Sequence, residues 1–293
     1  MSMKTEPRKA GTVQPTEQQA ANEPAMTTGA RRTLGRSGAT ITVDHVSHAF
    51  ALAGGEDELV LDQVSFEIPS GEFVALVGPS GCGKTTVLNF MAGLIAPLSG
   101  QVVINGDVIT RPTRHTGYMF ARDALLPWRT AIANVESGLE IRGVAARERR
   151  ERAQNALDLV GLGSFAQHYP KQLSQGMRQR VAVARTLAMD PDTLLMDEPF
   201  AALDAQTRIR VQGEFTRIWE NSNKTVVLVT HDLAEAVLMA DRVIVLAARP
   251  GRIVADIAID LERPRDVEEL RFSTRFLELN SQVYEALKKG EAS

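Results

Sequence analysis

One glycine-rich segment narrows the choice of folds more than any other part of the chain. It reads GPSGCGKT at residues 78–85 and fits the pattern G-x-x-x-x-G-K-[ST]. A continuous apolar run at 73–77 precedes it, and an apparent helix at 85–92 follows. Glycines let consecutive backbone N–H groups face one anion, and the start of a helix adds a favourable dipole. The segment therefore predicts a polyphosphate-binding loop between a buried strand and a helix.

Individual residues of this loop have expected roles. Lys84 should reach the β- and γ-phosphates of a nucleotide, and the Thr85 hydroxyl should ligate Mg²⁺. Cys82 stands at a variable position of the pattern, and we interpret it as a small residue tolerated there rather than a nucleophile. The predicted nucleotide contacts of this segment are Gly78, Pro79, Ser80, Gly81, Cys82, Gly83, Lys84, Thr85 and Thr86.

A second chemical signal is a pair of carboxylates at the end of an apolar strand. Asp197 and Glu198 directly follow the predicted strand at 193–196. Adjacent carboxylates at a buried strand end repel each other and resist desolvation, so a cation or a reacting water is the expected reason for them. We expect Asp197 to belong to the Mg²⁺ shell and Glu198 to polarise a water that attacks the γ-phosphate.

The segment LSQGMRQR at 173–180 predicts a second anion-binding site. Ser174 is the predicted N-cap of a helix over 174–189, and Gly176 lies in its first turn. A single fold has little use for a second γ-phosphate site about 90 residues after the first. A head-to-tail pair of chains does, because each chain's second site can cover the nucleotide of its partner.

Strands alternate with helices along the chain, which predicts an α/β fold with a largely parallel sheet. Apolar patterns predict strands at 41–46, 59–68, 73–77, 193–196 and 225–229, and a hairpin joining 102–104 to 108–109. Further helices are predicted at 130–139, 145–160 and 205–220, and residues 267–289 are predicted to form a charged amphipathic helical tail. Residues 1–40 lack aromatic residues and contain few large aliphatic ones, so we predict a disordered N-terminal tail.

The composition of the 293 residues excludes several classes of protein. Apolar residues make up 44% and charged residues 24%, which excludes a mostly disordered chain. The 33 Lys and Arg against 36 Asp and Glu give a net charge of −3, which does not support nucleic-acid binding. The single cysteine allows no intrachain disulfide, and there is neither a run of about 18 apolar residues nor a signal-peptide core. We therefore expect a cytoplasmic location.

Four motifs, in this order and spacing, resemble the ATP-binding subunits of ABC transporters. They are GPSGCGKTT (78–86), LSQGMRQR (173–180), LLMDEPFAALD (194–204) and VTHDLAEA (229–236). The segments ALLPW (124–128) and ARPGRIVADIAIDLERPRD (248–266) resemble most the importer group that serves nitrate, sulfonate, taurine and bicarbonate. The resemblance covers roughly residues 41–290.

The resemblance implies an architecture. It implies a P-loop NTPase fold, the ABC cassette, with a RecA-like core, an antiparallel β subdomain and an α-helical subdomain. The ATP-binding domain would span residues 41–260, with the helical subdomain at about 121–185. A C-terminal helical extension would follow at 261–293.

The resemblance also implies roles for further residues. Phe50 matches the aromatic residue that stacks on adenine, and His231 matches the switch histidine that contacts the γ-phosphate. Asp204 matches the loop aspartate that links the two nucleotide sites of a dimer. The residues that match those closing on the partner chain's ATP are Ser174, Gln175 and Gly176.

The sequence departs from the family pattern most clearly at residue 121. The family usually places a Gln there, whose amide approaches Mg²⁺ and the attacking water, but this chain has Ala121, which cannot ligate a metal. Either Asp123 or a water substitutes, or the contribution of the Gln is dispensable. Gln175 and Met177 replace the usual Gly and Gln of LSGGQ, whereas Ser174 and Gly176, needed for close approach to phosphate, are kept.

The function implied is that of the ATP-hydrolysing subunit of an importer. Two copies, arranged head to tail on the cytoplasmic face of the membrane, would bind ATP and Mg²⁺. They would drive separate transmembrane permease subunits, to which an external solute-binding protein delivers the solute. Leu126 and Trp128 lie in an apolar stretch after residue 121, and we expect them to line the groove that receives the permease. Packing inside the helical subdomain is the alternative for these two residues.

Two other functions fit parts of the pattern. One is a soluble ABC ATPase of translation or DNA repair, which usually carries two cassettes or a long coiled-coil insertion; this chain shows one cassette and no such insertion. The other is a binding module that hardly hydrolyses ATP, prompted by Ala121. Turnover of Mg-ATP, compared with a Glu198→Gln variant, separates it from an ATPase.

Overall fold

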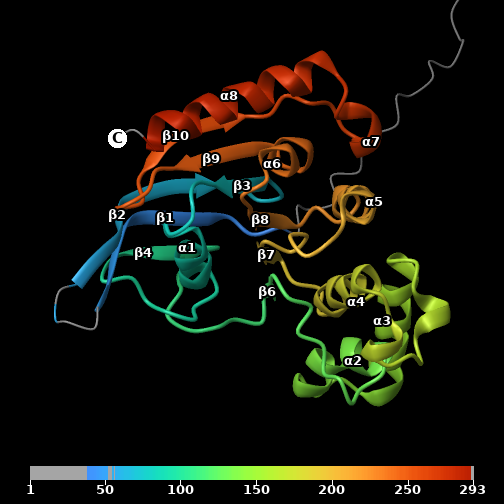
Figure 1. The fold of residues 1–293 in the computed structure, drawn as a ribbon. Helices are drawn as coiled ribbons and strands as arrows, with labels where there is room; N and C mark the ends of the chain where they lie inside the picture. The colour runs from blue at the N-terminus through green and yellow to red at the C-terminus, as the bar shows by residue number, and fades with distance from the viewer. Residues whose placement is uncertain (1–37, 52–54, 56, 292–293) are drawn as a thin grey trace, which may run out of the picture. The chain divides into compact units, whose positions relative to one another are not determined.

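Two β-sheets and the helix between them carry the phosphate loop (Figure 1). The structure, a computed structural model, describes residues 38–51, 55 and 57–291; residues 1–37 of the predicted tail lie outside the described part. The first described residues are already packed, since Ala39 is fully buried and its carbonyl accepts a 2.6 Å hydrogen bond from Thr225 Oγ1. The folded chain therefore begins slightly before the predicted start at Ile41.

The larger sheet has six strands in the order β10-β9-β3-β8-β7-β6, which confirms the predicted α/β core. All neighbouring pairs are parallel except β10, which pairs antiparallel with β9 at one edge. The central strands are continuous apolar runs because both faces of the sheet are covered. The strands are β3 Phe73–Val77, β6 Thr116–Met119, β7 Thr193–Asp197, β8 Thr225–Val229, β9 Arg242–Leu246 and β10 Ile253–Ala258.

The smaller sheet is antiparallel, in the order β2-β1-β4-β5, as the resemblance implies. Its strands are β1 Ile41–Ala51, β2 Asp57–Ile68, β4 Ser99–Ile104 and β5 Asp107–Val108. Side chains of β3 alternate between two cores. Val74 and Leu76 pack with the smaller sheet and with α1 (Lys84–Met91), whereas Phe73, Ala75 and Val77 pack with α5 (Ala205–Glu220) and α6 (Leu233–Met239).

Three helices gather beside the β6 edge of the parallel sheet (Figure 1). They are α2 (Ala131–Ile141), α3 (Ala146–Leu159) and α4 (Gln175–Ala188), and short 3₁₀ turns at 163–165 and 170–172 join the last two. Their buried apolar residues contribute to the core on the α5 face of the sheet. Ser174 caps α4 as predicted, since its Oγ accepts a 3.3 Å hydrogen bond from the Met177 N–H.

The C-terminal segment is helical, as predicted for 267–289, and is divided into two helices. The chain forms α7 (Val267–Leu270) and then α8 (Thr274–Glu291). Ser273 Oγ accepts a 3.2 Å hydrogen bond from the Phe276 N–H, so Ser273 starts a new helix by capping it. α8 packs against α6, β9 and β10. Within the described residues, every helix is too short or too polar to cross a bilayer.

Candidate active site

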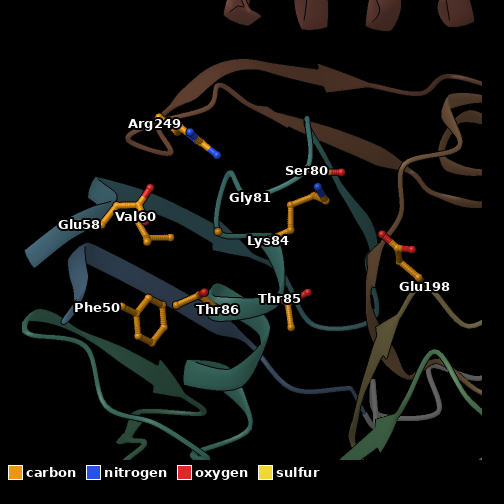
Figure 2. Close-up of a pocket in the computed structure, with 11 residues that line it drawn as sticks. Phe50, Glu58, Val60, Ser80, Gly81, Lys84, Thr85, Thr86, Glu198 and Arg249 are labelled. Carbon is orange, nitrogen blue, oxygen red and sulfur yellow. The ribbon is translucent and has the colours of Figure 1, made fainter. Parts of the chain in front are cut away.

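The phosphate loop and the end of β7 open onto one cavity of about 420 Å³ (Figure 2). It lies at the carboxyl ends of β3 and β7, which is where open parallel sheets bind their ligands. The end of β1 and the start of β2 supply the facing wall. The lining residues are Phe50, Glu58, Val60, Ser80, Gly81, Gly83, Lys84, Thr85, Thr86, Glu198 and Arg249.

The phosphate loop joins β3 to α1 and depends on two glycines. Gly81 and Gly83 have φ values of 80° and 91°, which L side chains rarely adopt. Lys84 is the first residue of α1, and its ammonium group donates to the carbonyl oxygens of Gly78 (2.8 Å) and Pro79 (3.0 Å). These two hydrogen bonds hold the start of the loop against the Lys84 side chain at its end. Six of the nine predicted contacts line the cavity: Ser80, Gly81, Gly83, Lys84, Thr85 and Thr86.

The other three predicted contacts of this segment do not line the cavity. Gly78 and Pro79 contribute the carbonyl groups that accept from Lys84. Cys82 is fully buried, with Sγ 3.7 Å from Lys84 Nζ, and burial raises the pKa of its thiol. These residues shape the loop from behind, which agrees with our interpretation of Cys82 as a small residue rather than a nucleophile.

Thr85 and Asp197 join the start of α1 to the end of β7. Thr85 Oγ1 donates a 3.0 Å hydrogen bond to Asp197 Oδ1. Burial raises the pKa of Asp197 and the charge of Glu198 raises it further, whereas the bond from Thr85 and the charge of Lys84 oppose this rise. A half-buried carboxylate beside a hydroxyl offers the hard oxygen ligands that Mg²⁺ prefers. Both residues therefore fit the metal role predicted for them.

Glu198 and His231 lie together at the edge of the cavity. Glu198 has a φ of 47°, in the left-handed region that non-glycine residues rarely adopt, and its N–H donates to the Val229 carbonyl (2.9 Å). This turn places the Glu198 carboxylate at the cavity, with Oε2 3.2 Å from His231 Nδ1. The structure thus brings the predicted base and the predicted switch histidine into contact from two adjacent strands.

Phe50 stands opposite the phosphate loop, at the end of β1. Its side chain is 43% exposed and packs edge-on against His48, with ring centroids 4.7 Å apart. The ring borders the cavity near Thr86 (Figure 2), where it offers an apolar face to a nucleotide base. Its position fits the stacking role that the resemblance implies.

Three lining residues were not predicted from the sequence: Glu58, Val60 and Arg249. Glu58 lies opposite Phe50 in the β1–β2 register, so the pairing of these two strands is the signal from which it could have been found. Arg249 lies in the loop between β9 and β10. No residue pattern around Arg249 predicts that it lies in the same cavity as the phosphate loop.

The residues predicted to act on a partner chain lie outside this cavity. Ser174, Gln175 and Gly176 form the start of α4, and Asp204 caps α5 by accepting a 3.0 Å hydrogen bond from the Thr207 N–H. The two helix starts are neighbours, because a Cβ on Gly176 would lie 2.5 Å from Thr207 Cγ2. The structure therefore brings the starts of the two helices together outside the cavity, with Ser174, Gln175 and Asp204 exposed and Gly176 buried against Thr207.

Asp123 does not take the place of the Gln that Ala121 replaces. Its carboxylate accepts hydrogen bonds from Arg178 Nε of α4 (2.9 Å) and from the Leu125 N–H (3.2 Å). Arg185 also donates to its main-chain carbonyl (2.8 Å). Asp123 thus fastens its loop to α4 and does not line the cavity, which leaves a water or a dispensable contribution as the alternatives.

The loop that carries Leu126 and Trp128 is fixed but presents a large apolar surface. Asn134 is fully buried; its side chain accepts from the Leu126 N–H (2.7 Å) and donates to the carbonyls of Leu126, Arg129 and Thr130 (3.0–3.1 Å). Trp128 is 71% exposed, so packing within the helical subdomain is the wrong alternative for this residue. Leu126 is partly buried.

Behind His231, a polar network joins α5 to α6. Arg208 of α5 pairs with Asp232 at 3.2 Å, and Gln212, one turn further along α5, donates to Glu235 Oε1 at 2.9 Å. Glu235 is almost fully buried, and this burial raises its pKa to about 7 against the opposing effect of the bonds from Thr230 and Gln212. The segment that carries His231 is therefore held by the helix that Asp204 caps.

The phosphate loop, the paired acids and the cavity between them define a P-loop nucleotide-binding protein. The family described as ABC transporter matches residues 61–201. The chain is 48% identical over 248 residues to an uncharacterized ABC transporter ATP-binding protein of Methanocaldococcus jannaschii, covering 85% of this chain and 91% of the relative. It is 43% identical over 255 residues to a taurine import ATP-binding protein of Rhizobium johnstonii, covering 86% and 97%. The chain belongs to the family of ATP-binding subunits of ABC transporters.

Solved structures agree with this assignment. The dimeric structure of a post-hydrolysis state of an ATP-binding cassette bound to ADP and Pi matches with a TM-score of 0.67 and 33% identity, covering 76% of this chain and all of that one. The dimeric structure of a bacterial ABC transporter cassette matches with the same TM-score and 34% identity, over the same shares of the two chains. The predicted cassette fold and the predicted ABC-type ATPase are confirmed.

Proposed function

We propose that this chain is the ATPase subunit of an importer and works as a head-to-tail pair on a separate transmembrane permease. The observation that carries the hydrolytic part is the contact of Glu198 with His231 at the mouth of the phosphate-loop cavity. Glu198 is placed to accept a proton from the attacking water, and His231 orients that carboxylate and contacts the γ-phosphate. A carboxylate and an imidazole in contact are what a site needs to activate water next to a held phosphate.

The remaining groups of the cavity hold the nucleotide in this proposal. Lys84 and the loop N–H groups bind its phosphates, and Phe50 stacks on its base. Thr85 and Asp197 hold Mg²⁺, which supplies neutralisation of phosphate charge when it is bound.

A second copy completes the site. Ser174, Gln175 and Gly176 of that copy bind the γ-phosphate through the start of α4, and Asp204 links the two sites. The support for this step is that Ser174, Gln175 and Asp204 are exposed at neighbouring helix starts outside their own cavity, and that the matching cassette structures are described as dimeric.

The proposed cargo is a small anion or zwitterion of the nitrate, sulfonate, taurine or bicarbonate type. Relatives at 38–44% identity are named taurine import ATP-binding proteins, and taurine is therefore the first solute to test. In this proposal the permease docks on the exposed Trp128 and the neighbouring Leu126, and the chain is a peripheral subunit on the cytoplasmic face of the membrane. An external solute-binding protein delivers the cargo to the permease.

The test is uptake into vesicles that contain the chain, the permease encoded beside it and the matching binding protein. Labelled taurine, an alkanesulfonate, nitrate and bicarbonate are supplied outside, with Mg-ATP on the side of the ATPase subunit. The proposal predicts ATP-dependent uptake of at least one of them, lost in Glu198→Gln. Full ATP turnover without uptake of any solute favours the soluble ATPase, and wild-type turnover as low as that of Glu198→Gln favours the binding module.

A further inference from the structure

The nucleotide cavity contains one cation for which the sequence predicted no role, although it belongs to the segment 248–266 that resembles the importer group. Arg249 lies between β9 and β10, and its guanidinium group extends into the cavity toward the phosphate loop (Figure 2). Its side chain is exposed. Within residues 38–51, 55 and 57–291, it has no hydrogen-bond acceptor and no carboxylate partner. Many other arginines of the chain pair with acids, for example Arg252 with Asp62, so a solitary guanidinium facing a phosphate loop is a distinctive arrangement.

The backbone that carries Arg249 is fastened on two sides. Gly251, two residues further, donates from its N–H to the Val60 carbonyl (2.8 Å), and its own carbonyl accepts from the Asp62 N–H (3.1 Å). Gly251 also packs directly on the phosphate loop, because a Cβ there would overlap the carbonyl oxygen of Cys82. The loop is therefore held against both β2 and the phosphate loop, so Arg249 reaches the cavity from a fixed base.

The charges around the cavity indicate what the Arg249 guanidinium group can bind. Glu58 and Glu198 face the cavity, and Asp197 lies behind Thr85. Lys84 is the only other lysine or arginine among the lining residues, and its ammonium group already bonds to two loop carbonyls. A nucleotide phosphate chain adds further negative charge, and arginine binds phosphate oxygens through its planar set of N–H donors.

We propose that Arg249 is a nucleotide-binding residue whose guanidinium group pairs with the phosphate chain of bound ATP or ADP, on the side of the cavity facing β2. The inference rests on the nucleotide-binding role proposed above for this cavity and adds a residue to it. Arg249 acts in the chain's own site and contributes to affinity, while the proton transfer belongs to Glu198.

The test is nucleotide binding by the full chain, measured by calorimetry or by competition with a fluorescent ADP analogue. ADP and adenosine are compared for the wild type, Arg249→Ala, Arg249→Lys and the control Arg147→Ala, which removes an exposed arginine of α3 that does not line the cavity. We expect Arg249→Ala to weaken ADP binding about tenfold or more, the size of a lost charge-assisted bond. Adenosine binding should not change, Arg249→Lys should be intermediate, and Arg147→Ala should match the wild type.

Two results would overturn the inference: unchanged ADP affinity in Arg249→Ala, and equal weakening of ADP and adenosine. If unchanged ADP affinity is accompanied by loss of ATP-driven pairing, Arg249 is assigned to contact with a second copy. Thermal melting of each variant shows whether the loop still folds. If the wild type itself binds neither ATP nor ADP, the proposed function fails first, and this result is distinct from an effect of Arg249.

Discussion

Two adjacent carboxylates at the end of β7 are separated by their surroundings into different roles. Asp197 is bonded to Thr85 in a half-buried position, whereas Glu198 turns to the cavity through its left-handed backbone and contacts His231. Neighbours in sequence therefore face different partners, because strand side chains alternate and the turn after Asp197 redirects the next residue. This division fits the metal role predicted for Asp197 and the proton-transfer role proposed for Glu198.

This division predicts that replacing Glu198 and Asp197 by their isosteric amides impairs ATP hydrolysis in different ways. Glu198→Gln keeps the volume of the side chain but cannot accept a proton, so we expect ATP turnover to fall by about 10²–10⁴-fold with nucleotide binding retained. Asp197→Asn should instead raise the Mg²⁺ concentration needed for half-maximal turnover. Phosphate release measured across a Mg²⁺ titration distinguishes the two. Identical Mg²⁺ dependence in Asp197→Asn and the wild type would contradict the metal role.

The buried Glu235 predicts a pH-dependent term in stability. Its folded-state pKa of about 7 lies above the ordinary value of 4.5, so the folded state binds this proton more tightly than the unfolded state does. The unfolding free energy should therefore fall as pH rises from about 4.5 through 7, by a contribution on the order of 3 kcal/mol at most. Glu235→Gln removes the term and can keep a bond to Gln212.

Urea unfolding of both proteins at pH 5 and pH 8 measures this term. Glu235→Gln should gain stability relative to the wild type on going from pH 5 to pH 8. An unchanged difference in unfolding free energy between the two proteins at the two pH values would show that Glu235 ionises as an ordinary exposed carboxyl.

Sequence reasoning found the residues that sit in contiguous motifs and missed those that only the fold brings together. Lys84, Thr85 and Glu198 are marked by the residue types around them, because a phosphate loop and an acidic strand end have local signatures. Arg249 lies far along the chain from the loop, in a segment whose position is set by the bonds of Gly251 to β2. Such a contact has no local signature.

At the scale of elements, the predicted strand and helix positions agree closely where one pattern dominates. Phe73–Val77, Ala205–Glu220 and Thr225–Val229 match the predicted ranges at both ends. The predicted C-terminal helical tail is divided near Ser273, where the serine side chain accepts a hydrogen bond from the N–H three residues later and so caps the start of α8. Periodicity alone does not detect such a break.

The loop anchored by Asn134 predicts a docking element for the permease. We expect Trp128→Ala to reduce association with the permease and transport-coupled ATP turnover, because it removes the largest exposed apolar side chain of this loop. Phe272→Ala is the matched control, since Phe272 is 78% exposed but lies between α7 and α8. Co-purification with the permease measures the effect. Equal retention of the permease by the two variants would contradict the assignment.

At the scale of the whole molecule, the residues predicted to serve one nucleotide lie in two separate places of the chain. The phosphate loop and Glu198 line one cavity, and His231 contacts Glu198, whereas the start of α4 and Asp204 lie outside the cavity. The arrangement is explained if a second copy, turned head to tail, places its α4 over the first copy's phosphates. Hydrolysis then requires two chains, each with an intact base and an intact α4 start.

ATP turnover by the purified chain at increasing protein concentration tests this central claim most directly. If paired chains form the active unit, turnover per chain should rise with concentration at saturating Mg-ATP. Mixing Ser174→Arg chains, which lack a usable α4 start, with Glu198→Gln chains should restore part of the activity that each lacks alone, because one of the two sites in a mixed pair has both its base and its partner's α4 intact. Turnover per chain that is independent of concentration, together with no recovery on mixing, would contradict the account.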